Sequence, residues 1–277
     1  MKDPIDNPGH IWNKIPALTL LFWIMKIIAT TFGETGGDFI AQTLNVGYGT
    51  STIIFFSFFL VVVIAQLMSK KYIPAIYWAV IVATSTSGTT MSDYMDRTLE
   101  LGYALGSLIL ISILIIVLIA WKITEKTISV SHIQSRRGEL FYWTAILFSN
   151  TLGTALGDFL ADDSGLGFAG SALLITAVLV LVVLGYYFTR ISRVVLFWIA
   201  FVLTRPFGAT FGDLLTKSKE KGGLGYGTEI ASLILLGLLV ILIIYETYRL
   251  KKTTLKDQNS TMRPVNLRVI APTSRER

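Results

Sequence analysis

The sequence predicts an all-α integral membrane protein with eight transmembrane helices, arranged as four parallel, pseudosymmetric repeats of two helices. Three observations support this prediction. The chain of 277 residues is 53% hydrophobic and only 15% charged, whereas a soluble domain carries about 25% charged residues. Eight apolar runs are long enough to cross a bilayer, which takes roughly 20 residues. One pattern of tryptophan, glycine and aspartate occurs four times at fixed spacing, which indicates internal repetition.

The eight apolar runs are the predicted spans. Two stretches, 109–121 and 175–188, have no polar face to present to water, which argues against a large soluble core. The first run lacks a clear small-residue cleavage site, so we interpret it as a retained helix and not as a removed signal peptide. The spans are expected at 16–35, 50–69, 73–92, 102–121, 140–158, 168–189, 194–212 and 227–248.

The repeats and their flanks divide the chain into seven segments. The tail is polar, with few large apolar residues, so we expect it to be disordered. The segments are an N-terminal segment (1–14), repeat 1 (15–72), repeat 2 (73–121), a basic loop (122–139), repeat 3 (140–193), repeat 4 (194–250) and the tail (251–277).

Composition excludes several kinds of site. Cysteine is absent, so neither disulfides nor thiolate metal sites can form. His10 and His132 both lie outside the predicted spans, so we expect no haem or zinc inside the membrane and no cofactor. The net charge of +6 comes from residues that flank the spans and from the tail, and such residues attract anionic lipid headgroups. The tail has no aromatic residue to stack on bases, so the expected partner is the lipid bilayer and not a nucleic acid.

The loop charges predict the orientation. Lysine and arginine in short loops mark the cytoplasmic side of a membrane, and they follow the second, fourth, sixth and eighth runs. Three of the four alternate connections are acidic, while the fourth, at 213–227, is basic and breaks the rule. We therefore expect both termini to be cytoplasmic.

Four segments align without gaps: 22–38, 77–93, 142–158 and 197–213. In each, a tryptophan in second place is followed ten residues later by a glycine and fifteen residues later by an aspartate. A glycine and an aromatic residue then open the second helix. Because each repeat contains two spans, all four repeats enter the membrane in the same orientation. The tryptophans are Trp23, Trp78, Trp143 and Trp198, and we expect them in an aromatic belt at the cytoplasmic interface.

The repeated glycines have two interpretations. Small residues four positions apart lie on one helix face and let neighbouring backbones approach closely, which is the interpretation we prefer. The alternative is local unwinding, in which freed carbonyls coordinate an ion. The glycines concerned are Gly33, Gly37, Gly88, Gly153, Gly157, Gly208 and Gly212.

The four repeated aspartates, Asp38, Asp93, Asp158 and Asp213, are the main candidates for an ion or substrate site. They could instead mark helix ends or cap the following segment. Glu34 lies four residues before Asp38 on the same face, and neighbouring carboxylates favour a bound cation or a shared proton. Oxygen ligands suit hard cations or the proton, but the pattern does not identify a metal.

Two cations within the spans are further candidates. Lys26 lies in the middle of the first span, and Arg205 takes the place held by Thr30, Ser85 and Asn150 in the other repeats. Charges inside a membrane are costly and commonly functional. Arg205 is expected either to pair with an aspartate of a neighbouring repeat or to bind an anionic substrate. Asp93 and Arg97, four residues apart, should neutralise each other.

The aligned segments, with GETGGD, SGTTMSD, LGTALGD and FGATFGD at their ends, resemble a family of bacterial membrane proteins of unknown function. That family is built from four tandem repeats of two transmembrane segments with a characteristic tryptophan. The resemblance implies a multi-pass protein of the prokaryotic inner membrane, and it supplies no substrate.

The function therefore has to be predicted from the residues. We expect a transporter or exporter of a small ion or polar solute that uses the carboxylates, with proton or cation coupling. The alternative is a non-transporting scaffold, sensor or assembly factor. An enzyme is not expected, because no nucleophile–base pair is evident.

Overall fold

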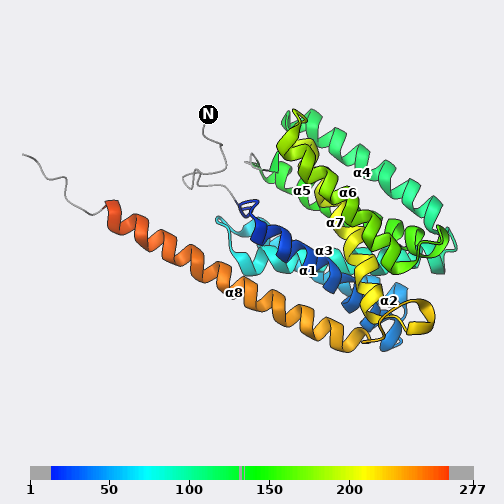
Figure 1. Ribbon diagram of the computed structural model, residues 1–277. Helices are drawn as coiled ribbons and strands as arrows, with labels where there is room; N and C mark the ends of the chain where they lie inside the picture. Colours follow the sequence, from blue (N-terminus) through cyan, green and yellow to red (C-terminus); the bar gives the residue numbers. More distant parts are fainter. Residues whose placement is uncertain (1–13, 131–132, 134, 262–277) are drawn as a thin grey trace, which may run out of the picture.

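The computed structural model describes residues 14–130, 133 and 135–261, with side chains up to residue 253. His10, His132, most of the N-terminal segment and the tail from residue 262 lie outside the described residues. The described chain forms eight α-helices and no strand, which confirms the all-α prediction. The helices are α1 (Leu20–Asp38), α2 (Tyr48–Met68), α3 (Pro74–Asp93), α4 (Tyr103–Glu125), α5 (Arg136–Asp158), α6 (Gly167–Phe188), α7 (Arg193–Thr216) and α8 (Thr228–Thr261) (Figure 1).

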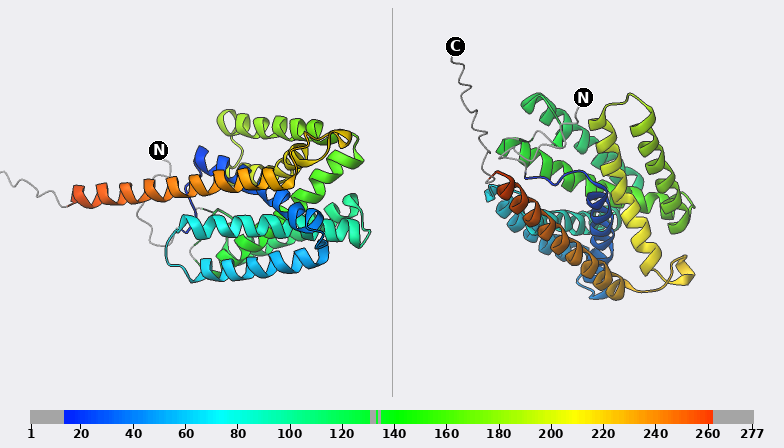
Figure 2. Two further views of the ribbon diagram at one scale, coloured as in Figure 1. Left: turned by 90° about the horizontal axis from the view of Figure 1, so that it is seen from below. Right: turned by 60° about the vertical axis from the view of Figure 1, so that its left-hand side comes forward.

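The first helices of the four repeats pack together in the middle of the molecule (Figure 2). Helix α1 contacts α3, α3 contacts α5, α5 contacts α7, and α7 returns to contact α1. We call these four helices the inner ring. Each second helix packs on the inner helix of the following repeat: α2 on α3, α4 on α5, α6 on α7, and α8 on α1. The last helix therefore closes the arrangement against the first.

The outer helices present apolar side chains outward, which is the reverse of a soluble protein. Leucine, isoleucine, valine and phenylalanine side chains of α2, α4, α6 and α8 are exposed along most of their length. Within the described residues, five helices are long and apolar enough to cross a membrane: α2, α4, α6, α7 and the part of α8 to Thr253. Helices α1, α3 and α5 fall outside this set because they bury threonine, serine and charged residues inside the ring.

Local signals explain several helix ends. Thr19 and Ser135 cap α1 and α5 by accepting hydrogen bonds from Phe22 N and Gly138 N. Pro74 occupies the first turn of α3, where its missing N–H costs no hydrogen bond. The glycine that opens each second helix has a positive φ, which accounts for the glycine–aromatic motif because only glycine adopts this conformation freely. The angles are +82° at Gly47, +72° at Gly102, +66° at Gly167 and +76° at Gly225.

The inner helices do not stop at their aspartates. In the first three repeats one π-helical turn follows the aspartate: η2 (Phe39–Thr43), η3 (Tyr94–Thr98) and η5 (Phe159–Asp163). In repeat 4, α7 stays α-helical to Thr216 and is followed by the short 3₁₀ turn η6 (Lys219–Lys221). Such π turns are frequent at functional sites.

The tryptophans correct one prediction. Trp78, Trp143 and Trp198 are only 0%, 2% and 5% exposed, so these three belong to the core and not to an aromatic belt, whereas Trp23 is half-buried. The three pack against aromatic residues beside the tryptophans, as Trp143 does against Tyr77 and Tyr142. The reason is that these side chains contact neighbouring segments of the protein: Trp78 reaches Glu246 of α8, and Trp198 reaches Trp121 of α4.

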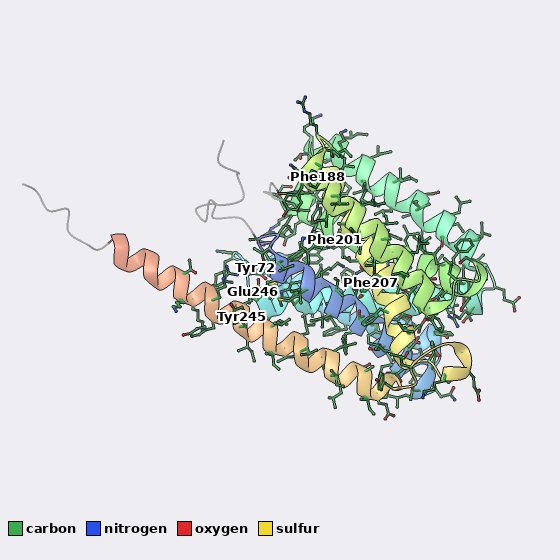
Figure 3. The ribbon with its side chains drawn as sticks, in the orientation of Figure 1. Tyr72, Phe188, Phe201, Phe207, Tyr245 and Glu246 are labelled. Atoms are coloured by element: carbon green, nitrogen blue, oxygen red, sulfur yellow. The ribbon has the colours of Figure 1, made fainter. Side chains whose placement is uncertain are left out.

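Helix α8 is also longer than predicted. It runs for 34 residues to Thr261 and so includes the start of the segment that we predicted to be disordered (Figure 1). Glu246 of α8 accepts hydrogen bonds from Tyr72 Oη and Trp78 Nε1, both at 2.9 Å (Figure 3). These bonds fix α8 against the start of α3.

Candidate functional site

The four repeated aspartates lie at one end of the inner ring, each at the C-terminal end of an inner helix or within its last turn. All four are buried, with exposed fractions of 2–3%. Asp38, Asp93 and Asp158 precede the π turns without forming a side-chain capping hydrogen bond. These three residues therefore mark the ends of their α-helices, as the alternative predicts, but they do not cap the following segment.

Lys217 joins the aspartates of the first and last repeats. Its Nζ lies 2.6 Å from Asp38 Oδ2 and 3.2 Å from Asp213 Oδ1. The other oxygen of Asp38 accepts a hydrogen bond of 2.6 Å from Gln42 Nε2. Each carboxylate oxygen of Asp38 thus has its own partner: Gln42 of the following π turn and Lys217 of repeat 4.

Arg97 joins the other two aspartates. Its Nε lies 2.9 Å from Asp93 Oδ1, so the pairing expected from their spacing is present, and a terminal nitrogen lies 3.3 Å from Asp158 Oδ2. Arg97 and Lys217 each follow the aspartate of their own repeat by four residues. The aligned residues of the other two repeats are Gln42 and Asp162. Repeats 2 and 4 therefore carry a basic residue four positions after the aspartate, and its side chain also pairs with the aspartate of another repeat.

Arg205 occupies the centre of the inner ring and is fully buried. It donates to Glu34 Oε2 at 2.9 Å, to Thr154 Oγ1 at 2.6 Å and to Thr89 Oγ1. Glu34, Thr89 and Thr154 stand eleven residues after the tryptophan of their repeats, so one guanidinium contacts all three other inner helices. The expectation that Arg205 pairs with an aspartate was wrong, because Glu34 lies opposite it.

Lys26 is also fully buried, but no direct ion pair joins it to the carboxylates among the described contacts. Its Nζ lies 3.3 Å from Asn150 Oδ1 and 4.1 Å from the centre of the Phe201 ring. Asn150 donates in turn to Thr84 Oγ1 at 2.9 Å. Lys26 is therefore stabilised by an amide and an aromatic face, and it lies apart from the aspartate cluster.

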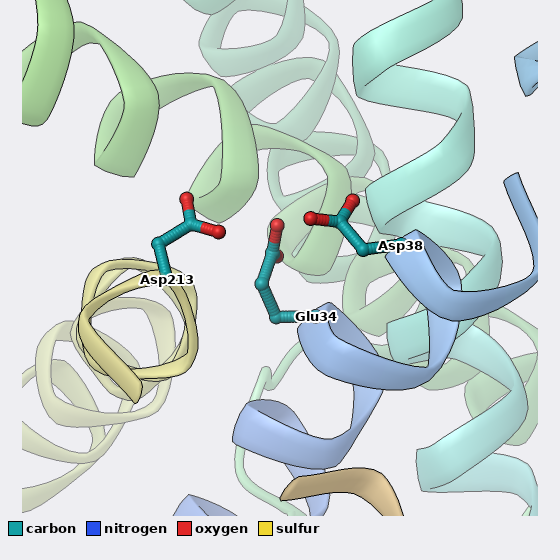
Figure 4. A group of neighbouring side chains, drawn as sticks. All are labelled: Glu34, Asp38 and Asp213. Atoms are coloured by element: carbon teal, nitrogen blue, oxygen red, sulfur yellow. The ribbon is translucent and has the colours of Figure 1, made fainter. Parts of the chain in front are cut away.

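Three of the carboxylates come close enough to share a cation. Oxygens of Glu34, Asp38 and Asp213 lie within 4.8 Å of one another (Figure 4). Glu34 and Asp38 come from α1 and Asp213 from α7, and all three carboxyl groups point towards the same space. A set of carboxylate oxygens suits hard cations such as magnesium, calcium or manganese.

The repeated glycines lie at the contacts between inner helices. A methyl group on Gly33 would overlap Ser85, one on Gly153 would overlap Arg205, and one on Gly88 would lie 2.9 Å from Thr151 N. Gly208 meets Thr30 of the first repeat in the same way. The second glycine of each pair makes the next contact along: Gly37 with Thr89, Gly157 with Ala209 and Gly212 with Glu34. These contacts let the inner helices, and with them the aspartates, approach closely.

A further acidic group lies just beyond the end of α3. Asp96 in η3 accepts a hydrogen bond of 3.2 Å from Ser92 Oγ. Burial raises the pKa of Asp96 from its ordinary value of 3.8 to about 6, against the opposing effects of Ser92 and Arg97. Asp96 is thus the carboxyl group beside the cluster whose charge changes in mildly acidic solution.

Sequence reasoning missed several of these residues. Lys217 follows Asp213 by four residues, as Arg97 follows Asp93, and that spacing was the available signal. Thr89 and Thr154 were detectable as the positions aligned with Glu34. The π turns had no recognisable signal in the residues.

One family model matches the chain four times. The model is described as Repeat of Unknown Function (DUF347), and it matches residues 21–72, 76–127, 141–192 and 196–252. The four matches coincide with the four repeats that the tryptophan, glycine and aspartate spacing predicts. No curated protein and no solved structure matches the chain.

Proposed function

Because the chain belongs to the family of the Repeat of Unknown Function (DUF347), whose description assigns no activity, we propose a function from the site itself: a membrane transporter or exporter of a small ion or polar solute. In this proposal all eight helices span the prokaryotic inner membrane as four parallel repeats, related by a pseudosymmetry axis along the membrane normal. Both termini are cytoplasmic, and the aspartates lie towards the outer face.

The observation that carries this proposal is the charge imbalance of the buried cluster. Five carboxylates, those of Glu34 and the four aspartates, form direct ion pairs with only Arg97, Arg205 and Lys217 among the described side chains. Neighbouring buried carboxylates that lack sufficient counter-charge favour a proton or a bound cation. Intramembrane carboxylates of this kind commonly form ion or proton pathways.

Lys217 gives the cluster a means of exchanging its cation. The ammonium bridges Asp38 and Asp213, while the side chain is 18% exposed at the end of α7. If the ammonium moves out towards solvent, the oxygens of Glu34, Asp38 and Asp213 remain within reach of one incoming ion. The tethered cation and the free cation would then compete for the same oxygens.

The test is a flux measurement in proteoliposomes. Internal pH is followed while single mono- and divalent cations are added outside, with wild type compared with Asp38→Asn and Asp158→Asn. Asp163→Asn is the matched control, because Asp163 lies in the π turn of repeat 3 and is exposed. The proposal predicts cation-dependent proton movement in wild type and the control, reduced at least tenfold in both site variants.

Two outcomes count against this proposal. An absence of flux in folded wild type for every cation tested would rule out proton-coupled cation transport. Flux that survives both substitutions would remove the aspartates from the pathway. The first result would favour the alternative, a non-transporting scaffold, sensor or assembly factor, which is supported by the continuous glycine contacts around the inner ring. The second would leave a transporter whose pathway does not use the aspartates.

A further inference from the structure

A cavity of about 160 Å³ lies at the end of the bundle opposite the aspartates. It is bounded by the end of α2, the start of α5 and the residues just before α1. Trp143 lines it, and Asp158 stands fifteen residues further along the same helix. At 1.5 Å per residue the two sites are separated by roughly 22 Å, so this cavity is no part of the carboxylate cluster.

Three residues that line the cavity each carry a buried polar atom without a hydrogen-bond partner among the described residues. The atoms are Trp143 Nε1, Gln66 Oε1 and Glu139 Oε1. The three residues are 2%, 1% and 6% exposed. Buried polar groups are almost always satisfied, so one donor and two acceptors among the lining residues indicate that a polar molecule completes the site.

Two of the three aligned tryptophans show what Trp143 lacks. Trp78 Nε1 donates to a carboxylate oxygen of Glu246 at 2.9 Å, and Trp198 Nε1 donates to Ile128 O at 3.0 Å. Trp143 lines the cavity, and its Nε1 has no acceptor among the described residues. The missing partner of this indole is therefore an oxygen acceptor that the described residues do not supply.

The charges around the cavity favour an anion. Lys14, Lys70 and Arg136 line it, against the single carboxylate of Glu139. Lys14 Nζ already pairs with Glu139 Oε2 at 2.7 Å, which leaves Lys70 and Arg136 as exposed positive charges at the rim. Arg136 also begins α5, and a helix N-terminus adds partial positive charge. A carboxylate fits both these charges and the indole of Trp143.

The two acceptor atoms specify a second group on the ligand. Gln66 Oε1 and Glu139 Oε1 can be satisfied only by a donor, such as a hydroxyl or ammonium group. We propose that this cavity is a binding site for a small organic anion that carries such a donor, with its carboxylate at Trp143 and its donor group at Gln66 and Glu139. The proposal is independent of the transport function and stands on the opposite end of the bundle.

Malate and succinate form a matched pair of probes, because they differ by one hydroxyl group. Binding to the purified full chain in lipid nanodiscs is measured by isothermal titration calorimetry. We expect wild type to bind malate at least fivefold more tightly than succinate. Trp143→Phe should weaken malate binding at least tenfold, and Gln66→Leu should bring the two affinities within twofold of each other.

Trp143→Phe removes a polar atom that has no partner among the described residues, and Gln66→Leu also removes only the 3.5 Å hydrogen bond from Gln66 Nε2 to Lys14 O, so the variants should fold. Thermal melts check this. Trp23→Phe is the matched control and should bind malate as wild type does, because Trp23 does not line the cavity. Asp38→Asn should also bind malate normally, which separates this site from the proposed transport site. An absence of malate binding to wild type, or equal binding by wild type and Trp143→Phe, would mean that the cavity holds only water and would overturn the proposal.

Discussion

Lys217 Nζ lies 2.6 Å from Asp38 Oδ2, although the two residues are 179 positions apart in the chain. This contact joins the last repeat to the first, and Arg97 joins the second repeat to the third in the same manner. The four aspartates are therefore arranged as two bridged pairs and not as a ring of four equal acceptors. Each pair has its own counter-ion at the same position of the repeat.

The first prediction concerns the bridge at Lys217. Lys217→Gln should lower the free energy of unfolding by about 3 kcal/mol, because it leaves the buried carboxylates of Asp38 and Asp213 without their shared counter-ion. Millimolar magnesium or calcium should restore part of the melting temperature in this variant and have little effect on wild type. Thermal unfolding in detergent measures both effects.

Lys219→Gln is the control for this experiment, since Lys219 is exposed in η6. It should behave as wild type with and without the divalent cation. If the melting temperature of Lys217→Gln does not respond to any cation, the three nearby carboxylates do not form a cation site.

A second prediction compares two glycines. Gly153→Ala should destabilise the protein by about 1–3 kcal/mol, because the added methyl group overlaps Arg205 and Pro206 in the centre of the ring. Gly237→Ala in α8 meets nothing within 4 Å and should be neutral or stabilising by up to about 1 kcal/mol. Equal melting temperatures for the two variants would show that the inner helices do not pack as closely as described.

The third prediction concerns the central ion pair. Arg205→Met should destabilise the protein by about 3–5 kcal/mol, because Glu34 is then buried without its counter-charge. The double variant Glu34→Gln with Arg205→Met should recover part of this loss, since neither charge remains. A double-mutant cycle of unfolding free energies measures the coupling. Additive effects of the two substitutions would contradict a direct ion pair.

The fourth prediction is a pH dependence at Asp96. Burial raises the pKa of Asp96 to about 6 in the folded protein, whereas the ordinary value of 3.8 applies to the unfolded chain. The folded state therefore binds the proton more tightly than the unfolded state. The stability contributed by protonated Asp96 is present below about pH 4 and is lost as the pH rises through 6. Asp96→Asn should remove this component from the pH profile of the melting temperature, whereas Asp163→Asn should leave the profile unchanged.

The sequence predicted the equivalent positions and the pairing of Asp93 with Arg97 correctly, but not the partners that come from other repeats. It placed Asp38, Asp93, Asp158 and Asp213 at one end of four inner helices, where they are found. Which aspartates share a cation depends on the order of the inner helices around the ring. That order is set by packing between segments far apart in the chain, and no local spacing encodes it.

The tryptophans and the central charges show a second limit. A tryptophan near a helix start fits both a membrane interface and a protein core, and only the direction of its side chain decides between them. Arg205 was recognised as needing a partner, but Glu34 was considered only as a neighbour of Asp38. The two residues meet because α7 closes on α1, which is a tertiary contact.

The closure of the inner ring bears on how such a chain could have originated. The junction between repeats 4 and 1 uses the same aligned positions as the junctions between consecutive repeats: Gly208 meets Thr30 as Gly33 meets Ser85. A polypeptide of two repeats would therefore have one inner helix whose glycine face is not covered. Its other inner helix would leave the opposite face, which packs against such a glycine, uncovered as well. Two such half-length chains would satisfy each other as a dimer, so the present protein has the architecture of a fused pair. Expressing 1–126 and 127–277 as separate chains and isolating their complex would test whether the two halves assemble in this way.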